Sequence, residues 1–276
     1  MPEIAEVQTM VNDLNQEVRG RTFLNFWTDA PKLIRHPKAK KFNQKIKGKK
    51  IKKARRRGKV IIVELSNDLL LLFHAKMTGH FLLGQNSLEE KFKDYYIHAA
   101  FYLDNNKILG WTDQRKFSRI ELWSKEEKDK IDLLQNLGPE PLEVSFQDFY
   151  KIIHNNRSQI KCLLLKQDQI VGIGNIYASE ILWAAKIHPE KKASDLTRKE
   201  VKTLYEEMQR ILEEAIKLRG TTTAEFRDIK DKKGQYVNKL QAYHKDGEKC
   251  SRCKKSIVKK KICGRSTFFC PQCQSK

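Results

Sequence analysis

The chain has 276 residues, with 55 Lys and Arg against 34 Asp and Glu, a formal net charge of +21 and a pI of about 9.7. This excess of positive charge points to a polyanion, foremost nucleic acid, although a merely basic surface has the same composition. The sequence contains neither a run of roughly twenty apolar residues nor a signal peptide, so we expect a cytoplasmic protein that does not cross membranes.

The first half has the pattern of an antiparallel β-sandwich preceded by one helix. Residues 5–19 place their apolar side chains on one helical face. Between residues 22 and 123, short apolar runs are separated by turn residues, as expected for strands. Examples are Val60–Leu65, Leu69–Phe73 and His98–Leu103.

A break at Leu137–Leu142, with the sequence LGPEPL, precedes a region of helical spacing. Apolar residues recur there at three- and four-residue intervals. The predicted helices are Phe146–His154, Ser158–Leu165, Asn175–Ala185 and Leu196–Leu218. Strands followed by helices predict an α+β protein of several domains.

Two Cys-x-x-Cys pairs near the C-terminus predict a zinc ribbon. They are separated by sixteen residues, the length of one β-hairpin, and their four thiolates suit a tetrahedral Zn²⁺. The pairs are Cys250 with Cys253 and Cys270 with Cys273. Two disulfides are the alternative, but six cysteines in 276 residues are few for a disulfide framework. We expect one structural zinc, because four sulfur ligands leave no position for a catalytic water.

Two basic stretches and a glycine-containing turn are candidate phosphate contacts. Residues 38–59 and 254–261 are rich in Lys and Arg, which is typical of a solvated face or of a phosphate track. The turn at Val171–Asn175 joins two predicted helices and would bind the DNA backbone, unless it serves only tight packing. Cys162, on an apolar face of the first of these helices, is expected in the core.

Taken together, these segments resemble the formamidopyrimidine-DNA glycosylase and endonuclease VIII family of base-excision repair enzymes. The opening PEIAEV, LGPEPL, VGIGNIYASE and GRSTFFCPQCQ occur in the family's order along essentially the whole chain. The resemblance implies a catalytic β-sandwich at residues 1–124 and a helix-two-turn-helix DNA-binding domain at 125–220. Residues 221–276 would hold a lesion-capping segment and, from about 245, the zinc ribbon.

The resemblance implies that Pro2, after removal of Met1, is the nucleophile and that Glu3 is the acid/base partner. A free α-amine has a pKa of about 8, so a useful fraction is neutral at pH 7. Attack of a secondary amine on C1′ gives an iminium with no N–H proton to lose, which favours β,δ-elimination of the flanking phosphates. Without the family, a Pro-Glu opening is commonplace.

Other residues are assigned to DNA binding by the same resemblance. Lys59, Asn175 and Arg265 would contact phosphates near the lesion, where the planar guanidinium of Arg265 suits bidentate contact. His98 is a further expected DNA contact. Each of the basic residues is otherwise only one more charge on a basic surface.

Base extrusion requires side chains that fill the vacated stack. His74–Gly79 resembles the family loop with a methionine wedge, Met77, and Asp113–Phe117 resembles the loop with Arg115 and Phe117. Taken alone, Met77 and Phe117 would be read as core residues, and only the loop context favours wedges.

The chain also departs from the family pattern. Ala5 stands where the family often has proline, Gln114 replaces the proline of the wedge loop, and Lys116 and Ser118 replace its usual Arg and Gly. These departures bear on lesion preference and loop stiffness. The expected activity is removal of oxidised purines, 8-oxoguanine and formamidopyrimidines, from double-stranded DNA, and cleavage at abasic sites, by a monomer. Alternatives are an endonuclease VIII-like activity on oxidised pyrimidines and a non-catalytic damaged-DNA-binding protein. The stretch from Arg219 to Thr223 and beyond would cap the extruded base and favours the first activity.

Overall fold

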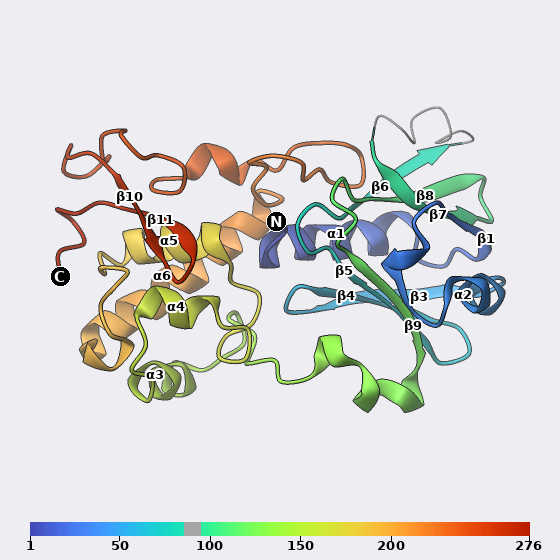
Figure 1. Ribbon diagram of the computed structural model, residues 1–276, viewed down its shortest axis with the longest axis horizontal. Helices are drawn as coiled ribbons and strands as arrows, with labels where there is room; N and C mark the ends of the chain where they lie inside the picture. The colour runs from blue at the N-terminus through green and yellow to red at the C-terminus, as the bar shows by residue number, and fades with distance from the viewer. Residues whose placement is uncertain (86–94) are drawn as a thin grey trace. The chain divides into compact units, whose positions relative to one another are not determined.

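The computed structural model describes residues 1–85 and 95–276 of the chain (Figure 1). Its packing divides these residues into two units. The first contains Met1–Gln135 and Leu218–Gln235, and the second contains Asn136–Lys217 and Tyr236–Lys276. Each unit is thus assembled from two separate segments. The domain boundaries expected at residues 124 and 220 stay predictions.

The first unit contains two β-sheets, as predicted. One has the strand order β1-β7-β8-β6 and the other β2-β9-β5-β4-β3. The neighbours are antiparallel except for β2 and β9, which are parallel. The strands are β1 (Phe23–Thr28), β2 (Ile34–His36), β3 (Ile51–Arg57), β4 (Val60–Leu65), β5 (Leu69–His74), β6 (His80–Gln85), β7 (Ile97–Leu103), β8 (Lys107–Thr112) and β9 (Arg119–Ser124).

The two faces of the central strands explain why β4 and β5 are apolar at nearly every position. Ile61 and Val63 of β4 point into the main core, whereas Val60 and Ile62 pack on the opposite face with Ile131. A strand covered on both sides needs apolar residues at even and odd positions alike. Aromatic rings fill the space between the sheets.

Two helices complete this core. Helix α1 (Ile4–Glu17) buries the apolar face predicted for residues 5–19, including Val7 and Met10. Helix α2 (Ala39–Ile46) lies inside the basic run and was not predicted. It has only two buried anchors, Phe42 and Ile46, among exposed lysines, which is too weak a pattern to recognise as a helix.

The second unit contains the four predicted helices and the ribbon hairpin. The helices are α3 (Phe146–His154), α4 (Ile160–Leu165), α5 (Asn175–Ala184) and α6 (Arg198–Lys217), and the hairpin consists of β10 (Val258–Ile262) and β11 (Arg265–Phe269). Helices α5 and α6 pack together, and β11 lies against α5 (Figure 1).

Short 3₁₀ turns occur at η1 (Pro31–Leu33), η2 (Lys125–Lys130), η3 (Asp132–Leu134), η4 (Ala193–Asp195) and η5 (Tyr236–Lys239). Among the described residues, no helix has the length and apolar character required to span a membrane.

Candidate active site and nucleic-acid interface

The N-terminal residues are buried and tied to the segment that returns from residue 218. Pro2 is buried and Glu3 is 2% exposed, whereas Met1 is exposed. The carboxylate of Glu6 accepts the backbone N–H of Glu3 at 2.7 Å and that of Thr221 at 2.7 Å. Gly220, whose φ is +80, has no room for a side chain, because a Cβ would lie 2.7 Å from Glu6 Oε1. Glu6 therefore positions Glu3 beside the returning segment.

Two further carboxylates, Asp13 of α1 and Asp228 of the returning segment, bind Arg219. The guanidinium of Arg219 donates to Asp13 at 2.7 Å and to Asp228 at 2.8 Å. Both carboxylates are almost fully buried. Burial raises the pKa of Asp13, and its hydrogen bond with Arg219 opposes that rise. Residues 218–235, which include the predicted capping segment, are thus held at their start and middle on the first unit.

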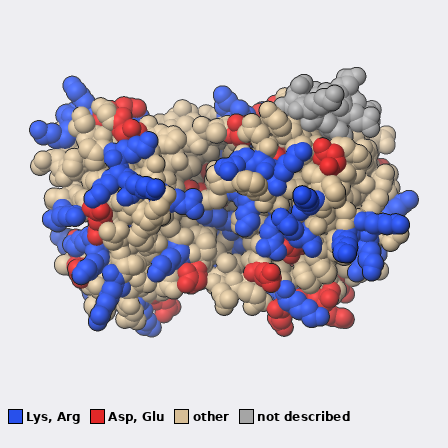
Figure 2. Space-filling model, viewed as in Figure 1, with Lys and Arg blue, Asp and Glu red and all other residues tan. Residues whose placement is uncertain are grey.

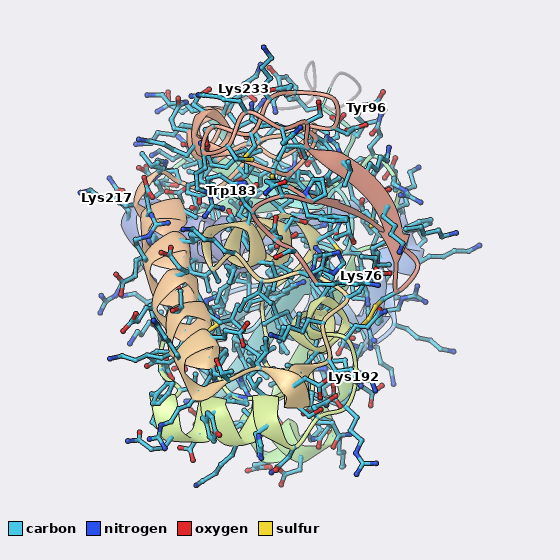
Figure 3. All side chains as sticks on the ribbon, turned by 90° about the vertical axis from the view of Figure 1, so that its left-hand side faces the viewer. Lys76, Tyr96, Trp183, Lys192, Lys217 and Lys233 are labelled. Carbon is cyan, nitrogen blue, oxygen red and sulfur yellow. A yellow bond between two sulfur atoms is a disulfide. The ribbon has the colours of Figure 1, made fainter. Side chains whose placement is uncertain are left out.

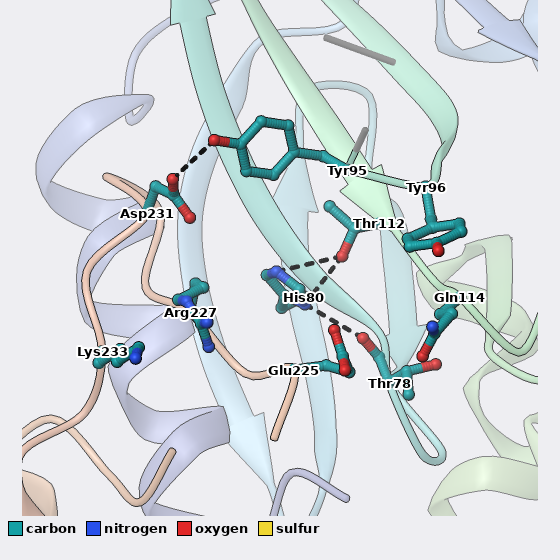
Figure 4. A pocket seen from close by; sticks show the side chains of 10 residues that line it. All are labelled: Thr78, His80, Tyr95, Tyr96, Thr112, Gln114, Glu225, Arg227, Asp231 and Lys233. Atoms are coloured by element: carbon teal, nitrogen blue, oxygen red, sulfur yellow. Dashed lines mark hydrogen bonds between the residues drawn. The ribbon is translucent and has the colours of Figure 1, made fainter. Parts of the chain in front are cut away.

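A polar cavity of about 360 Å³ lies between this segment and the sheet strands β6 and β8 (Figure 4). At its wall, His80 Nδ1 lies 2.8 Å from Thr112 Oγ1 and 3.1 Å from the carbonyl of Thr78. Burial lowers the pKa of His80 to about 4, so the ring is neutral at pH 7. Tyr95 donates to Asp231 across the rim at 3.0 Å. The cavity therefore offers neutral donors and acceptors next to charged groups.

The two predicted wedge loops are joined by one buried carboxylate. Asp113, which is 0% exposed, accepts the hydroxyl of Thr78 from one loop and the N–H of Ser118 at 2.8 Å within the other. Gly79 closes the first loop at a place without space for a side chain, because a Cβ would lie 2.5 Å from Trp111. The loops Ala75–Gly79 and Asp113–Ser118 therefore form one connected structure.

The predicted wedge residues are not core residues. Met77 is half-buried, Arg115 is exposed, and Phe117 is 51% exposed. The Arg115 guanidinium lies over the Phe117 ring, 4.6 Å from its centroid. Core packing, the alternative suggested by the residue types alone, is wrong for Phe117. A large exposed aromatic side chain on a braced loop is suited to insertion between bases.

Lys59 and His98 are buried in the first unit, and His74 is half-buried there. Lys59 is 9% exposed and directly precedes Val60, which pairs with His74 in the sheet register. Burial, with Lys76 and Lys59 nearby, lowers the pKa of His74 to about 3. His98 Nδ1 bonds to Asp29 at 2.9 Å, while its buried Nε2 has no partner among the described residues. A hydrogen-bond partner outside the described residues would satisfy that nitrogen.

In the second unit, side chains hold the turn between α4 and α5. Gln167 donates to the carbonyl of Ile173 at 2.9 Å and accepts the N–H of Gly172, whose φ is +91. Lys161, which is 0% exposed, donates to the carbonyl of Asn175 at 3.1 Å and to Ser179 at 2.7 Å. These bonds fix the start of α5 relative to α4.

The predicted phosphate contacts Asn175 and Arg265 are brought together in this unit. Asn175 Nδ2 donates to the carbonyl of Ser266 at 2.8 Å, one residue after Arg265. The Arg265 side chain is exposed and forms no ion pair within the described part of the chain. Asn175 Oδ1 is buried without a described partner. The first residue of α5 and the first residue of β11 therefore belong to the same surface.

The last residue of the VGIGNIYASE motif has a structural role that the sequence did not reveal. Glu180 is 2% exposed and accepts the backbone N–H groups of Gln241, Ala242 and Tyr243 at 2.8, 2.9 and 2.8 Å. Burial raises the pKa of Glu180, and these three N–H groups oppose the rise. Glu180 thereby attaches the segment that leads into the ribbon to helix α5.

The four predicted metal ligands form one cluster. The Sγ atoms of Cys250, Cys253, Cys270 and Cys273 all lie within 4.8 Å of one another. Zn–S bonds of about 2.3 Å in a tetrahedron place sulfurs about 3.8 Å apart, so the donor set and its spacing fit one zinc ion. The protein has one structural zinc, held by these thiolates, and the alternative of two disulfides in the ribbon is wrong.

The remaining cysteines differ from the expectation. Cys162 is half-buried and forms a disulfide with Cys263, which is exposed at the turn between β10 and β11. The expected core position of Cys162 is wrong because its sulfur is bonded to Cys263 in the hairpin turn. A helical pattern cannot reveal a partner that is 101 residues away.

In the view of Figure 2, Lys and Arg side chains cover more of the surface than Asp and Glu side chains. The predicted track at residues 38–59 contributes exposed lysines from α2, including Lys40, Lys41 and Lys45. A positive surface binds the DNA backbone without sequence preference. Together, the sandwich, the two-helix turn and the zinc ribbon define the class of three-part DNA glycosylases.

Comparisons with known proteins assign the chain within this class. Residues 1–120 match the formamidopyrimidine-DNA glycosylase N-terminal domain, residues 137–227 match the H2TH domain of these enzymes, and residues 247–276 match the zinc finger found in FPG and IleRS. The chain belongs to the formamidopyrimidine-DNA glycosylase family.

Relatives resemble the chain over its whole length. It is 36% identical to formamidopyrimidine-DNA glycosylase of Desulforamulus reducens and 38% identical to that of Pelotomaculum thermopropionicum, covering 99% of each chain in both cases. A Lactococcus lactis FPG mutant bound to Fapy-dG containing DNA superposes with a TM-score of 0.91, at 34% identity and with 100% of both chains covered. A MutM structure with carbocyclic 8-oxo-G containing DNA has a TM-score of 0.90, at 34% identity and with 100% of both chains covered.

Proposed function

We propose that the protein is a bifunctional DNA glycosylase and abasic-site lyase that removes oxidised purines, 8-oxoguanine and formamidopyrimidines, from double-stranded DNA. The observation that carries this proposal is the buried Pro2-Glu3 terminus, linked through Glu6 to the segment at Thr221. Family membership and the Fapy-dG and 8-oxo-G DNA bound by its structural relatives support the same substrate class.

The proposed chemistry begins once Met1 has been removed, because a proline nitrogen within a peptide bond is not nucleophilic. The free amine of Pro2 attacks C1′, the damaged base leaves with the electrons of the glycosidic bond, and Glu3 protonates the sugar ring oxygen. The resulting iminium withdraws electrons, so loss of a C2′ proton expels the 3′ phosphate and a second elimination expels the 5′ phosphate. Water then releases Pro2 from the sugar fragment.

The DNA contacts are assigned to groups on both units. Lys59, Asn175 and Arg265 would hold phosphates near the lesion, and the buried His98 Nε2 without a described partner supports a further contact there. Insertion of Met77, Arg115 and Phe117 would fill the gap left by the extruded nucleotide.

We assign the polar cavity of Figure 4 to the extruded base. The cavity of about 360 Å³ has room for a purine and lies against the predicted capping segment. Its neutral His80 and its hydroxyl groups can exchange hydrogen bonds with the edge of an oxidised purine. The zinc ribbon would present Arg265 to the DNA. We place this reaction in the cytoplasm and expect the protein to act as a monomer.

Borohydride trapping tests the proposal, because borohydride reduces the iminium to a stable covalent adduct. Duplexes with 8-oxoguanine opposite cytosine, with thymine glycol, or with an abasic site are compared, and adducts are expected on the first and third. Pro2→Gly should abolish excision but retain binding, and intact mass should report whether Met1 is removed. Trapping only on thymine glycol would indicate the oxidised-pyrimidine activity. Binding without any adduct, in protein that lacks Met1, would indicate a non-catalytic binder.

A further inference from the structure

Cys162 and Cys263 join the helices of the second unit to the tip of the ribbon hairpin by a disulfide, drawn in yellow in Figure 3. Cys162 is the third residue of α4, and Cys263 occupies the turn between β10 and β11 with φ +49. Their Cα atoms are 5.8 Å apart, within the range that a disulfide requires. The bond connects positions separated by 101 residues.

This pair is separate from the zinc ligands. The four ligand sulfurs form one cluster within 4.8 Å, and neither Cys162 nor Cys263 belongs to it. Zinc therefore holds the base of the ribbon hairpin, whereas the disulfide holds its tip. Opening the disulfide leaves the metal site with all four thiolates.

The surroundings of the pair permit reaction in the folded protein. Cys263 is exposed and Cys162 is only half-buried, so small reagents can reach the sulfurs. Gln159 Oε1 lies 3.4 Å from Cys162 Sγ and 3.9 Å from Cys263 Sγ. In the reduced state this oxygen can accept from either thiol and keep the two sulfurs facing each other.

We infer that Cys162 and Cys263 are a reversible oxidation site for hydroperoxides and low-molecular-weight disulfides. With a hydroperoxide, one thiolate takes the terminal oxygen as a sulfenic acid and releases an alcohol, and the second thiol displaces water to form the S–S bond. With glutathione disulfide, the first thiolate displaces one glutathione thiol and the second displaces the other. Either route removes two electrons and two protons, and two thiol equivalents return them.

The bond acts on the predicted DNA surface through the hairpin turn. Cys263 precedes Arg265 by two residues, and the next residue, Ser266, accepts from Asn175. In the disulfide form, the turn that carries Arg265 is covalently fixed to α4. Fixing a binding group in one arrangement reduces the entropy lost on binding. This consequence, unlike the oxidation itself, rests on the proposed function.

The first experiment identifies the bond without DNA. The zinc-loaded enzyme is equilibrated in glutathione buffers of rising disulfide content, quenched with acid, alkylated and digested without reduction. A Cys162–Cys263 peptide is expected under oxidising conditions and two alkylated cysteines under reducing conditions, with the zinc content unchanged. The inference is overturned if both residues are alkylated throughout, or if either one pairs with a ribbon cysteine.

The second experiment measures the dissociation constant for duplex DNA with a tetrahydrofuran abasic-site analogue. Oxidised enzyme should bind about fivefold more tightly than reduced enzyme, a modest coupling between two sites. Cys162→Ser and Cys263→Ser should each bind with one affinity in both buffers. Equal affinity of both wild-type forms would overturn the effect on DNA. A failure of borohydride trapping would instead refute the proposed function and leave the peptide result intact.

Discussion

Truncation of Phe117 separates the wedge role from folding. The side chain is 51% exposed and belongs to no core cluster, and its described ring contact is the Arg115 guanidinium at 4.6 Å. An exposed cation–π pair contributes about 0.5–1 kcal/mol. We therefore expect Phe117→Ala to lower the free energy of unfolding by at most about 1 kcal/mol, because it opens no cavity.

The expected effect on DNA is larger. Stacking of an aromatic side chain on a base is worth about 1–3 kcal/mol, and the middle of this range, about 2 kcal/mol, corresponds to roughly thirtyfold. The value of kcat/KM on an 8-oxoguanine duplex should fall by about this factor. Cleavage of a single-stranded abasic oligonucleotide should change little, because no base has to leave a duplex stack.

Single-turnover cleavage of both substrates measures the difference, and urea denaturation checks folding. Leu24→Ala is the matched control, because Leu24 is 49% exposed on β1 and has no predicted DNA role. The wedge assignment is refuted if Phe117→Ala loses no more activity than Leu24→Ala. It is also refuted if duplex and single-stranded cleavage fall by the same factor.

Three further predictions concern Glu180, His74 and the zinc site. Glu180→Gln replaces one of the two oxygens that accept three backbone N–H groups, so the free energy of unfolding measured in urea should fall by about 3 kcal/mol. Glu213→Gln, at an exposed position, should leave the urea midpoint unchanged. Equal midpoints for the two variants would contradict the anchoring role of Glu180. His74 has a pKa of about 3 in the folded chain against an ordinary 6.5, so the unfolded chain takes up a proton first and stability is lost as pH falls from 6.5 toward 3. At pH 5 this loss is about 2 kcal/mol, and urea curves of His74→Gln should depend less on pH than those of the wild type; parallel dependence would show that the group does not matter. Removal of zinc by a chelator should unfold the ribbon and lower the salt dependence of DNA binding by at least one phosphate contact, that of Arg265, and an unchanged slope would contradict its role.

Local patterns were sufficient for much of the fold. The apolar strands, the four helices of the second unit and the cysteine ribbon depend on short-range periodicity or spacing, and the structure confirms them. Helix α2 was missed because Phe42 and Ile46 are its only buried anchors among lysines. The motif context also identified Phe117 as a wedge candidate, although residue type alone favoured the core.

The anchors of the site could not be predicted because their partners are remote in sequence. Glu6 meets Thr221 and Arg219 meets Asp13, each across more than two hundred residues. Cys162 meets Cys263 across 101 residues. A single sequence contains no signal for such pairs. The only local hint was the acidic residue three positions after Glu3, at the start of a helix.

The buried acids share a physical purpose in this strongly basic chain. Glu6, Asp13, Asp113 and Glu180 are each at most 3% exposed, and each is bonded to a backbone N–H, a hydroxyl or an arginine of a segment that bears on the predicted site. With a net charge of +21, exposed cations repel one another and do not hold loops in place by themselves. Anchoring from within by buried carboxylates leaves the surface cations available for phosphate. Loss of one buried carboxylate should therefore displace its loop while the positive surface that attracts DNA persists.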